Sequence, residues 1–258
     1  MKLSIIIVNY KSRVYLEKCL GAIFSKIELG ENFEVIVVNN GAEEELVDLT
    51  LIFPKIKVKQ NKNNRGFGSG NNLGAKAARG EVLLFLNPDA ELVSANVSTV
   101  LGEFEKNNEV GIVGSRLLTK NNAVQKWSAG REITFLQILK NNLGWKEKLS
   151  SEKKQEVAWV SGTAMFVRKN LFEALRGFDC RFFMYFEDVD LCLRARKLGK
   201  TVLYFPTFSA VHYGGKSYRE KEDQKKHYYQ AQDYYFQKHF GFWQAKLLKI
   251  LRFITYAF

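Results

Sequence analysis

Residues 3–40 read LSIIIVNYKSRVYLEKCLGAIFSKIELGENFEVIVVNN, and this stretch decides the fold. The runs 3–9 and 33–40 are short, apolar and rich in β-branched residues, and both end in asparagine, so they predict two strands. The segment between them, 12–26, has the length of a helix. Because the strands are apolar enough to be covered on both faces, they are typical of a parallel sheet with helices on both sides.

The same alternation continues toward the middle of the chain. It predicts strands at 55–61, 80–87 and 110–115 and helices at 43–52, 67–79 and 95–107. In this architecture ligands bind at the carboxyl ends of the strands. Those ends carry Asn9-Tyr10, Asn39-Asn40, Asn61 to Asn64 and Asn87-Pro88-Asp89.

Beyond residue 115 the character of the chain changes. Residues 116–156 are basic and irregular, with a helix predicted at 133–142 and a mobile loop at 146–156. The elements predicted after them are a strand that runs into a helix at 169–176, a helix at 187–198, a strand at 201–206 and a long helix at 219–240. Since there is no internal repeat and no Pro/Ser linker, the sequence predicts one α/β domain, 1–217, with a helical, basic and aromatic extension, 218–258.

The charge of the chain favours an anionic partner. A formal net charge of +12 fits a nucleic acid, a phosphorylated small molecule or an anionic membrane surface. The excess lies outside the first hundred residues, because 116–156 and 216–258 each hold nine Lys/Arg against four acids. Cys19, Cys180 and Cys192 are widely spaced without a CxxC pair, so they favour reduced, cytoplasmic thiols over a disulfide framework or a zinc site.

The apolar segments at the two ends of the chain bear on localisation. The N-terminal run is short and lacks a cleavage pattern, so it is interpreted as a buried strand rather than a signal peptide. No stretch reaches the ~18 uninterrupted apolar residues that span a bilayer, which predicts a soluble or peripheral protein. The tail 241–258 mixes apolar bulk with Lys246, Lys249 and Arg252. It fits a helix lying on an anionic bilayer, with a homodimer contact or packing on the domain as alternatives.

Asp89 lies in NPDAEL (87–92), directly after a nearly pure apolar strand. A single carboxylate at such a strand end can bind a divalent cation that takes its other ligands from phosphate and water. The alternative is a capped turn before helix 95–107. His212 follows a strand and precedes two glycines, and taken alone it is more typical of a packed or surface residue than of a ligand.

The segment 63–80, NNRGFGSGNNLGAKAARG, is a glycine-rich loop that opens a helix. Glycines permit close backbone approach and helix N-terminal amides attract anions, so the segment favours a nucleotide or sugar pocket. A dinucleotide fingerprint is excluded, because the segment follows the third strand and has Leu73 where the last glycine would stand.

Residues 185–199, YFEDVDLCLRARKLG, hold three acids directly after an aromatic run. Either the acids form an ion-pair scaffold at the edge of a core, or a carboxylate lines a cleft. Asp190 and Arg194 are spaced i, i+4 and are predicted to pair on one helix face. Glu187 fits a helix cap slightly better than an acceptor contact. Trp159 fits a buried strand position as well as stacking on a sugar ring.

Seven segments of the chain together carry a resemblance to a known family. They are SIIIVNY, VVNNG, NRGFGSGNNLG, LFLNPDAEL, VSGTAMFVRK, GFDCRFFMYFEDVDLCLRARKLG and AVHYGGKS, spread in this order over about 3–217. In this order they resemble the family 2 inverting glycosyltransferases of the GT-A fold, in particular the bacterial rhamnosyltransferase-like branch that builds cell-surface polysaccharides. The resemblance implies a mostly parallel sheet with helices on both faces.

The resemblance also implies roles for single residues. It places Asp89 on Mg²⁺ or Mn²⁺ and on the donor diphosphate, with His212 in the metal shell, and it makes Asp188 the catalytic base. Asn87 stands where many members carry the first Asp of a DxD motif. The implied donor contacts are Asn9, Tyr10, Asn39, Asn64, Gly66, Asn72, Asn87 and Asp89, and the implied acceptor contacts are Trp159, Gly162 and Glu187. Asn39 replaces an Asp that accepts a hydrogen bond from uracil or thymine in the family. An amide oxygen can still accept that bond, so a nucleotide donor is expected and its base is left open.

The expected function is metal-dependent, inverting transfer of a sugar, rhamnose or another hexose, from a nucleotide diphosphate donor. The acceptor is a hydroxyl of a cell-surface glycan or lipid-linked glycan at the cytoplasmic membrane face. Inversion needs a carboxylate opposite the leaving diphosphate, and the metal stabilises the leaving group. One alternative is a non-catalytic nucleotide-sugar-binding subunit of a membrane assembly. Another, nucleic-acid binding by helix 219–240, is disfavoured because that face has no recognisable RNA-binding motif.

Overall fold

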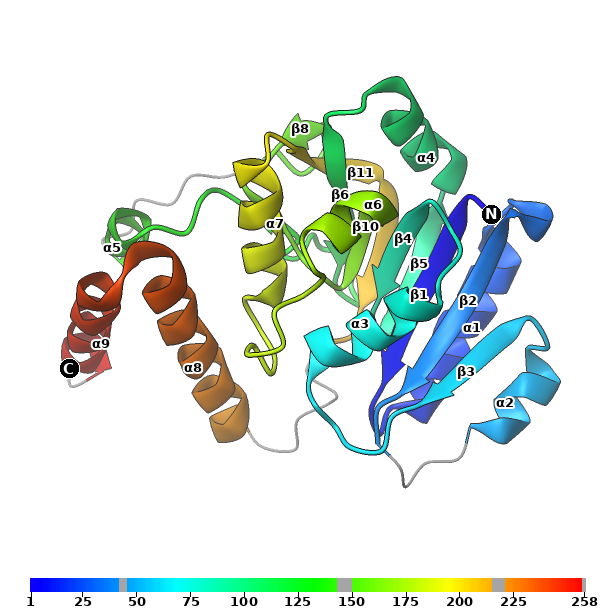
Figure 1. Cartoon of the computed structure of the whole chain (residues 1–258), viewed down its shortest axis with the longest axis horizontal. Coiled ribbons are helices and arrows are strands. Elements are labelled where there is room, and N and C mark those ends of the chain that lie inside the picture. Colours follow the sequence, from blue (N-terminus) through cyan, green and yellow to red (C-terminus); the bar gives the residue numbers. More distant parts are fainter. Residues whose placement is uncertain (42–45, 143–149, 215–220, 257–258) are drawn as a thin grey trace.

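The computed structural model describes the chain of 258 residues except for 42–45, 143–149, 215–220 and 257–258. A central sheet lies between helices, and the first half alternates strand and helix as predicted (Figure 1). Its elements are β1 (Leu3–Asn9), α1 (Arg13–Lys26), a 3₁₀ turn (Gly30–Asn32), β2 (Phe33–Asn39), α2 (Val47–Ile52), β3 (Ile56–Gln60), α3 (Phe67–Ala77) and β4 (Val82–Leu86). The first residues of the predicted helix 43–52 lie outside the described part of the chain.

The second half is less regular. Its elements are β5 (Ala90–Ala95), α4 (Val97–Lys106), β6 (Val110–Leu118), β7 (Ala129–Gly130), α5 (Phe135–Asn142), β8 (Gln155–Glu156), β9 (Trp159–Val160), β10 (Ala164–Arg168), α6 (Lys169–Ala174), α7 (Glu187–Lys197), β11 (Thr201–His212), α8 (Lys221–Phe240) and α9 (Phe242–Tyr256). Part of the predicted mobile loop 146–156 and the start of the predicted helix 219–240 lie outside the described residues.

The main sheet is mostly parallel. Its strands follow the order β3-β2-β1-β4-β10-β6-β11-β5, with β8 paired to β11. The first four strands are parallel to one another and β6 is parallel to β11, whereas β10 and β5 are antiparallel to their neighbours. The register places Asn9 beside Asn39 and Asn39 beside Gln60, so the strand ends meet at one edge of the sheet. The predicted fold class is confirmed.

The strand predicted within 156–169 is divided into β9 and β10. Two further predicted elements, both next to the NPD turn, differ from the structure. Residues 90–95 form β5, and helix α4 begins only at Val97, where the side chain of Asn96 accepts a hydrogen bond from the amide of Thr99. The predicted strand 201–206 continues as β11 to His212, because its second half pairs with β5 and β6. The alternative interpretation of the NPD segment as a capped turn before helix 95–107 is therefore wrong in its second half, because the turn at 87–90 leads into β5 and not into the helix.

Successive residues of the strands supply two cores, one on each face of the sheet. Ile5 and Ile7 of β1 pack with α1 and α4, whereas Ile6 between them packs with α3, α6, α7 and α8. This alternation is the ordinary period of a strand covered on both faces. The three cysteines form no disulfide, as predicted.

Helices α8 and α9 form a pair joined at Gly241, which has a φ of +90° (Figure 1). The pair lies beside α7 and shares the second core through Ala231, Tyr235 and Phe236, which are buried. The extension is thus packed on the sheet domain. Of the helices that the structure describes, none combines the length and the hydropathy that a bilayer crossing needs.

Candidate active site

A cavity of about 610 Å³ opens at the carboxyl ends of β1, β2 and β4 and is closed on its other side by residues 183–189 and α8. Ten of the residues singled out in the sequence line it: Tyr10, Asn64, Gly66, Asn87, Asp89, Trp159, Gly162, Glu187, Asp188 and His212. They come from segments that are up to two hundred positions apart in the chain. This volume is within the range of sites that bind small molecules.

Asparagine side chains tie the strand ends to the glycine-rich loop. The side-chain Nδ2 of Asn40 donates to Oδ1 of Asn64 at 2.9 Å, and Nδ2 of Asn61 donates to Oδ1 of Asn40 at 2.7 Å. Oδ1 of Asn64 also accepts from the backbone N–H of Gly66 at 2.9 Å. Short side chains with both donors and acceptors hold the loop at the mouth of the sheet. Asn40 also lines the cavity, although the sequence had not indicated it as a contact to donor or acceptor.

Gly66 allows the loop to touch the opposite wall of the cavity. Its φ is +90°, and a Cβ built on it would lie 2.2 Å from the carbonyl oxygen of Phe183. The next residue, Phe67, donates its backbone N–H to that same oxygen at 2.9 Å. Only glycine permits both the conformation and the close approach at this position.

Asp89 and His212 face each other at the bottom of the cavity. Oδ1 of Asp89 is 3.4 Å from Nε2 of His212, and Nδ1 of His212 is 3.1 Å from Oε1 of Gln125. Because a carboxamide oxygen only accepts, Nδ1 carries the proton and donates to Gln125, which leaves the Nε2 lone pair facing Asp89. Two acceptors in this arrangement are suited to a shared cation. Gln125 also donates to the backbone carbonyl of His212 at 2.7 Å, which fixes the ring.

The side-chain oxygen of Asn87, a residue that lines the same cavity, is a further candidate ligand for a divalent metal ion. Asn87 Oδ1 is buried, and no described atom hydrogen-bonds to it. One carboxylate, one imidazole and one amide oxygen, with room in the cavity for a diphosphate, fit Mn²⁺ or Mg²⁺, because these ions accept phosphate and water oxygens as further ligands. Within the part of the chain that the structure describes, no three His, Cys, Asp or Glu side chains gather as a complete protein cage.

Asp188 lies in the first turn of α7, on the side of the helix that faces the cavity. Its Oδ2 accepts from the backbone N–H of Gly162 at 2.9 Å and its Oδ1 accepts from that of Val189 at 2.8 Å. Burial raises the pKa of Asp188 even though both hydrogen bonds act in the opposite direction. The side chain is thus an oriented carboxylate with increased basicity.

Glu187 is 5% exposed, and its Oε2 has no hydrogen-bond partner among the described residues. Burial first, and then the charge of neighbouring Asp188, raise the pKa of Glu187 well above its ordinary value. Because Asp188 accepts two backbone hydrogen bonds, a negative charge on this pair of acids is more stable on Asp188 than on Glu187. The interpretation of Glu187 as a helix cap is wrong, because Phe186 occupies the N-cap and Glu187 is already helical.

Three residues implied as donor contacts do not line the cavity. Asn72 exchanges hydrogen bonds with the backbone N–H and carbonyl of Phe178, both at 2.9 Å. Asn39 is 1% exposed and lies behind the wall, where its Nδ2 donates to Gln60 and its Oδ1 accepts from Asn9. These amides are held by protein groups, so the structure brings Asn40 rather than Asn39 to the cavity.

Trp159 occupies a buried strand position, as one of its two interpretations predicted, and its stacking on a sugar ring stays a prediction. It is a largely buried residue of β9 whose indole Nε1 donates to the carbonyl of Arg131 at 2.9 Å, and it still forms part of the cavity wall. Further aromatic walls that the sequence did not indicate come from Trp127 and from Tyr228 and Tyr229 of α8. For Tyr228 and Tyr229 the one signal in the sequence was the aromatic composition of helix 219–240.

Comparison with known proteins places these features in a family. The family model described as glycosyl transferase family 2 matches residues 4–176. The N-acetylglucosaminyl-diphospho-decaprenol L-rhamnosyltransferase of Mycobacterium tuberculosis is 24% identical over 97% of this chain and 89% of its own length. The low-salt glycan biosynthesis hexosyltransferase Agl10 of Haloferax volcanii is 27% identical over 81% of this chain, and the match covers 66% of the length of that relative.

A solved structure shares the fold. The crystal structure of GalNAc-T7 with UDP, GalNAc and Mn²⁺ superposes with a TM-score of 0.68 at 14% identity. The match covers 92% of this chain and 50% of the other. At this identity the likeness concerns the fold alone, which is that of the GT-A glycosyltransferases.

Proposed function

Because the chain belongs to glycosyl transferase family 2, we propose that it transfers a hexosyl group, with rhamnosyl favoured, from a nucleotide diphosphate sugar to a hydroxyl of a glycan or lipid-linked acceptor. The transfer inverts the anomeric centre and uses Mg²⁺ or Mn²⁺. One observation carries the proposal: the oriented carboxylate of Asp188 and the Asp89–His212 pair line one cavity at the carboxyl ends of parallel strands. The relatives that act on rhamnose and on other hexoses support the sugar class.

Asp188 serves as the general base in this proposal. The acceptor hydroxyl attacks the anomeric carbon while the bond from that carbon to the diphosphate oxygen breaks, and the hydroxyl proton passes to the carboxylate of Asp188. The Gly162 amide keeps the carboxylate oriented, and the Glu187 carboxyl, whose burial favours the protonated form, is the proposed hydrogen-bond donor to the acceptor beside the base. A single displacement needs no covalent glycosyl-enzyme, and it leaves the product with the opposite anomeric configuration.

Asp89, His212 and Asn87 are the residues that would hold the metal ion. When bound, the ion would neutralise charge on the departing diphosphate. Gln125 would keep Nε2 of His212 directed toward the ion through its bond to Nδ1, as outer-shell groups do for metal-binding histidines. Tyr10, Asn40, Asn64 and Gly66 line the adjacent wall and are the proposed contacts to the nucleoside and donor sugar.

The test is turnover with a panel of nucleotide diphosphate sugars in the presence of Mn²⁺. We expect one donor to release its nucleoside diphosphate faster when a lipid-linked glycan acceptor is added, and EDTA to abolish the release. NMR of the product should show the anomeric configuration opposite to that of the donor. Binding of a donor without turnover under any condition would instead identify a nucleotide-sugar-binding subunit.

Helix α9 is the proposed contact with an anionic membrane. Trp243, Leu247 and Ile250 recur on one face of the helix and are 76%, 48% and 48% exposed, and Lys246 and Lys249 flank them. Exposed apolar side chains between cations are typical of helices that lie in a bilayer interface. The net charge of +12 gives the same preference for anionic lipid. A lipid-linked acceptor would then be met at the surface where it resides.

Vesicle binding tests this surface. Trp243→Ser with Leu247→Ser should weaken binding to phosphatidylglycerol-containing vesicles by about tenfold or more, because two large side chains no longer leave water. The matched control is Leu51→Ser, an exposed leucine of α2 on a different part of the surface, which should leave binding unchanged. Equal binding by the double variant and the native protein would exclude α9 as the membrane contact. A concentration-dependent shift in sedimentation that the double variant abolishes would identify a homodimer face instead.

A further inference from the structure

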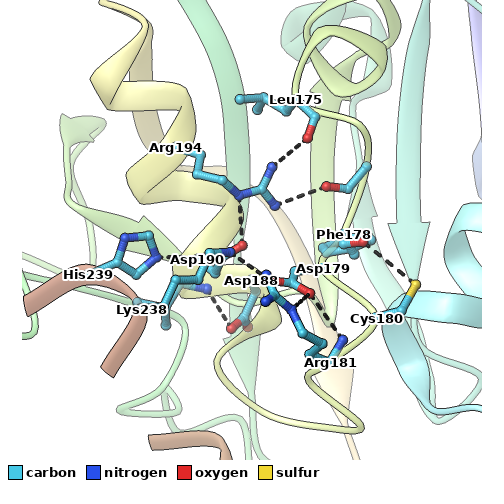
Figure 2. A network of polar contacts seen from close by, with 12 residues as sticks. Leu175, Phe178, Asp179, Cys180, Arg181, Asp188, Asp190, Arg194, Lys238 and His239 are labelled. Atoms are coloured by element: carbon cyan, nitrogen blue, oxygen red, sulfur yellow. Dashed lines mark hydrogen bonds and ion pairs between the residues drawn. The ribbon is translucent and has the colours of Figure 1, made fainter. Parts of the chain in front are cut away.

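Helix α7 carries a second carboxylate, Asp190, on the side opposite to the cavity. Two positions along a helix correspond to about 200° of rotation, so Asp190 points away from the face that carries Asp188. Asp190 is completely buried, and its Oδ2 accepts from Nε of Arg194 at 2.7 Å, which confirms the predicted i, i+4 pair. Its Oδ1 meets Nε2 of His239 at 2.7 Å and Nζ of Lys238, both carried by α8 (Figure 2).

Lys238 joins this carboxylate to the loop that precedes α7. Its Nζ also lies 2.8 Å from Oδ2 of Asp179, which accepts further hydrogen bonds from the hydroxyl of Tyr234 and from Arg181. Figure 2 shows Lys238 between the two acids. One ammonium group of α8 thus bridges α7 and the loop.

Arg194 holds the other end of the same loop. Its guanidinium donates to the carbonyl of Leu175 at 2.8 Å (Figure 2) and to that of Gly177 at 2.9 Å. Charged groups of Arg194 and Lys238 therefore fix the loop at two places relative to α7. Because buried charges are tolerated only when they are paired with good geometry, this network has one preferred arrangement.

The charges in the network are retained. Burial acts to raise the pKa of Asp190, but the hydrogen bond with His239 and the charges of Arg194 and Lys238 outweigh it and lower the pKa. Burial is likewise outweighed at Asp179, where Arg181 and Lys238 lower the pKa. Both acids are carboxylates at neutral pH, so the bridge through Lys238 is an ion pair on each side.

The loop held by the network ends in a strained turn next to the candidate base. Tyr185 and Phe186 have φ values of 71° and 63°, a left-handed conformation that residues with a Cβ adopt at a cost in free energy. Such a turn persists only where its surroundings hold it, and the Phe186 ring contacts Tyr228 and Tyr235 of α8 at 5.4 and 5.3 Å between centroids. Glu187 and Asp188 follow directly, so the turn sets their direction into the cavity.

We propose that Lys238 is a positioning residue: by bridging Asp179 of the loop and Asp190 of α7, it holds the strained turn that directs Asp188 toward the acceptor. This inference deepens the proposed function and rests on it. It makes α8 part of the catalytic unit, although its C-terminal turn does not line the cavity. The network acts on the base and on the acceptor wall. The glycine-rich loop on the donor side contacts the held loop at Phe183 and, through Asn72, at Phe178.

Lys238→Met tests the bridge, because it removes the ammonium group and keeps an apolar chain near the Phe182 ring, which lies 5.6 Å from Nζ. We expect kcat for transfer to fall by about tenfold or more, as small displacements of a catalytic group do. The KM for the donor should stay within about twofold, because the proposed donor contacts Asn40 and Asn64 are held by each other and by Gly66 and not by the network. Hydrolysis of the donor by water should rise relative to transfer. Amides of residues 177–186 should exchange faster with solvent deuterium.

Lys238→Arg and Lys226→Met are the matched comparisons. Arginine can bridge two carboxylates, so Lys238→Arg should recover kcat to within about threefold. Lys226 is an exposed lysine of the same helix, and its replacement should change neither turnover nor exchange. A native kcat in Lys238→Met, or an equal loss in Lys238→Arg, would overturn the proposal.

Two further readouts keep the test decisive. If Lys238→Met does not fold, Asp179→Asn removes the loop side of the bridge and leaves Asp190 paired, and it must give the same split between kcat and donor KM. Native turnover in Asp179→Asn would then overturn the proposal. If the native protein transfers no sugar, the proposed function fails by itself, and hydrogen exchange in 177–186 still decides whether Lys238 holds the loop.

Discussion

Asp188→Asn should lower kcat for sugar transfer by about 10²- to 10⁴-fold, the usual contribution of a positioned general base. Asparagine keeps the size of the side chain and an oxygen that can accept from the Gly162 amide, which is 2.9 Å from Oδ2 in the native protein. What it loses is the ability to take the acceptor proton. Binding of the nucleoside diphosphate should therefore remain close to native, as measured by calorimetry in the presence of Mn²⁺.

Glu187→Gln is the matched comparison, because the two acids are neighbours in one turn. The raised pKa of Glu187 favours its protonated form, which glutamine resembles in shape and in hydrogen bonding. We expect a much smaller loss of kcat than in Asp188→Asn. If the two variants show the reverse order, the base is Glu187. Full turnover in Asp188→Asn would remove Asp188 from the chemistry.

The pH dependence of the native enzyme should follow the same carboxylate. Only the ionised form of Asp188 accepts a proton, and burial raises its pKa, so the enzyme loses its base as the pH falls through that raised value. The acid limb of kcat should therefore lie above the range of an ordinary aspartate, and it should be absent from the residual activity of Asp188→Asn.

Much of the fold could be predicted because the first strands are apolar on both faces and are separated by helix-length segments. β5 was missed because its residues, AELVSA, show no regular alternation of apolar and polar side chains and follow the NPD turn without a break. The long β11 was missed in part because Pro206 and Thr207 interrupt its pattern. It continues because Ala210, Val211 and His212 pair with β5.

The candidate site could be predicted at Asp89 from a carboxylate that directly follows a nearly pure apolar strand, and at Asp188 and His212 only through the family resemblance. It was less predictable where the direction of a side chain decides. Asn39 and Asn40 are neighbours at the end of β2, and only packing selects the one that faces the cavity. The bonds from Lys238 and His239 to Asp190 span about fifty positions. No local pattern indicates such a contact.

Asp89→Ala should weaken Mn²⁺-dependent binding of nucleoside diphosphates by about 10²-fold or more, since loss of a ligand exceeds the 10- to 100-fold effect of an outer-shell partner. Asp89 is the only carboxylate of the proposed donor set, so the ion would lose its one anionic protein ligand. Titration of uridine, thymidine and guanosine diphosphates with and without Mn²⁺ measures the effect. Affinity that does not depend on Mn²⁺ in the native protein would contradict the assignment.

Two variants grade the contributions around Asp89. Gln125→Leu removes the group that fixes His212 and leaves all proposed ligands in place, so it should cost about 10- to 100-fold in Mn²⁺-dependent affinity. Glu91→Gln removes a charge two positions from Asp89 on β5, where the carboxylate accepts from the Tyr213 hydroxyl at 2.8 Å outside the cavity. It should leave the affinity unchanged. Equal losses of affinity in Asp89→Ala and Glu91→Gln would mean that the local negative potential attracts Mn²⁺. A large loss in Asp89→Ala, a smaller loss in Gln125→Leu and none in Glu91→Gln would instead require direct ligation of the ion by Asp89 and by His212, whose ring Gln125 holds.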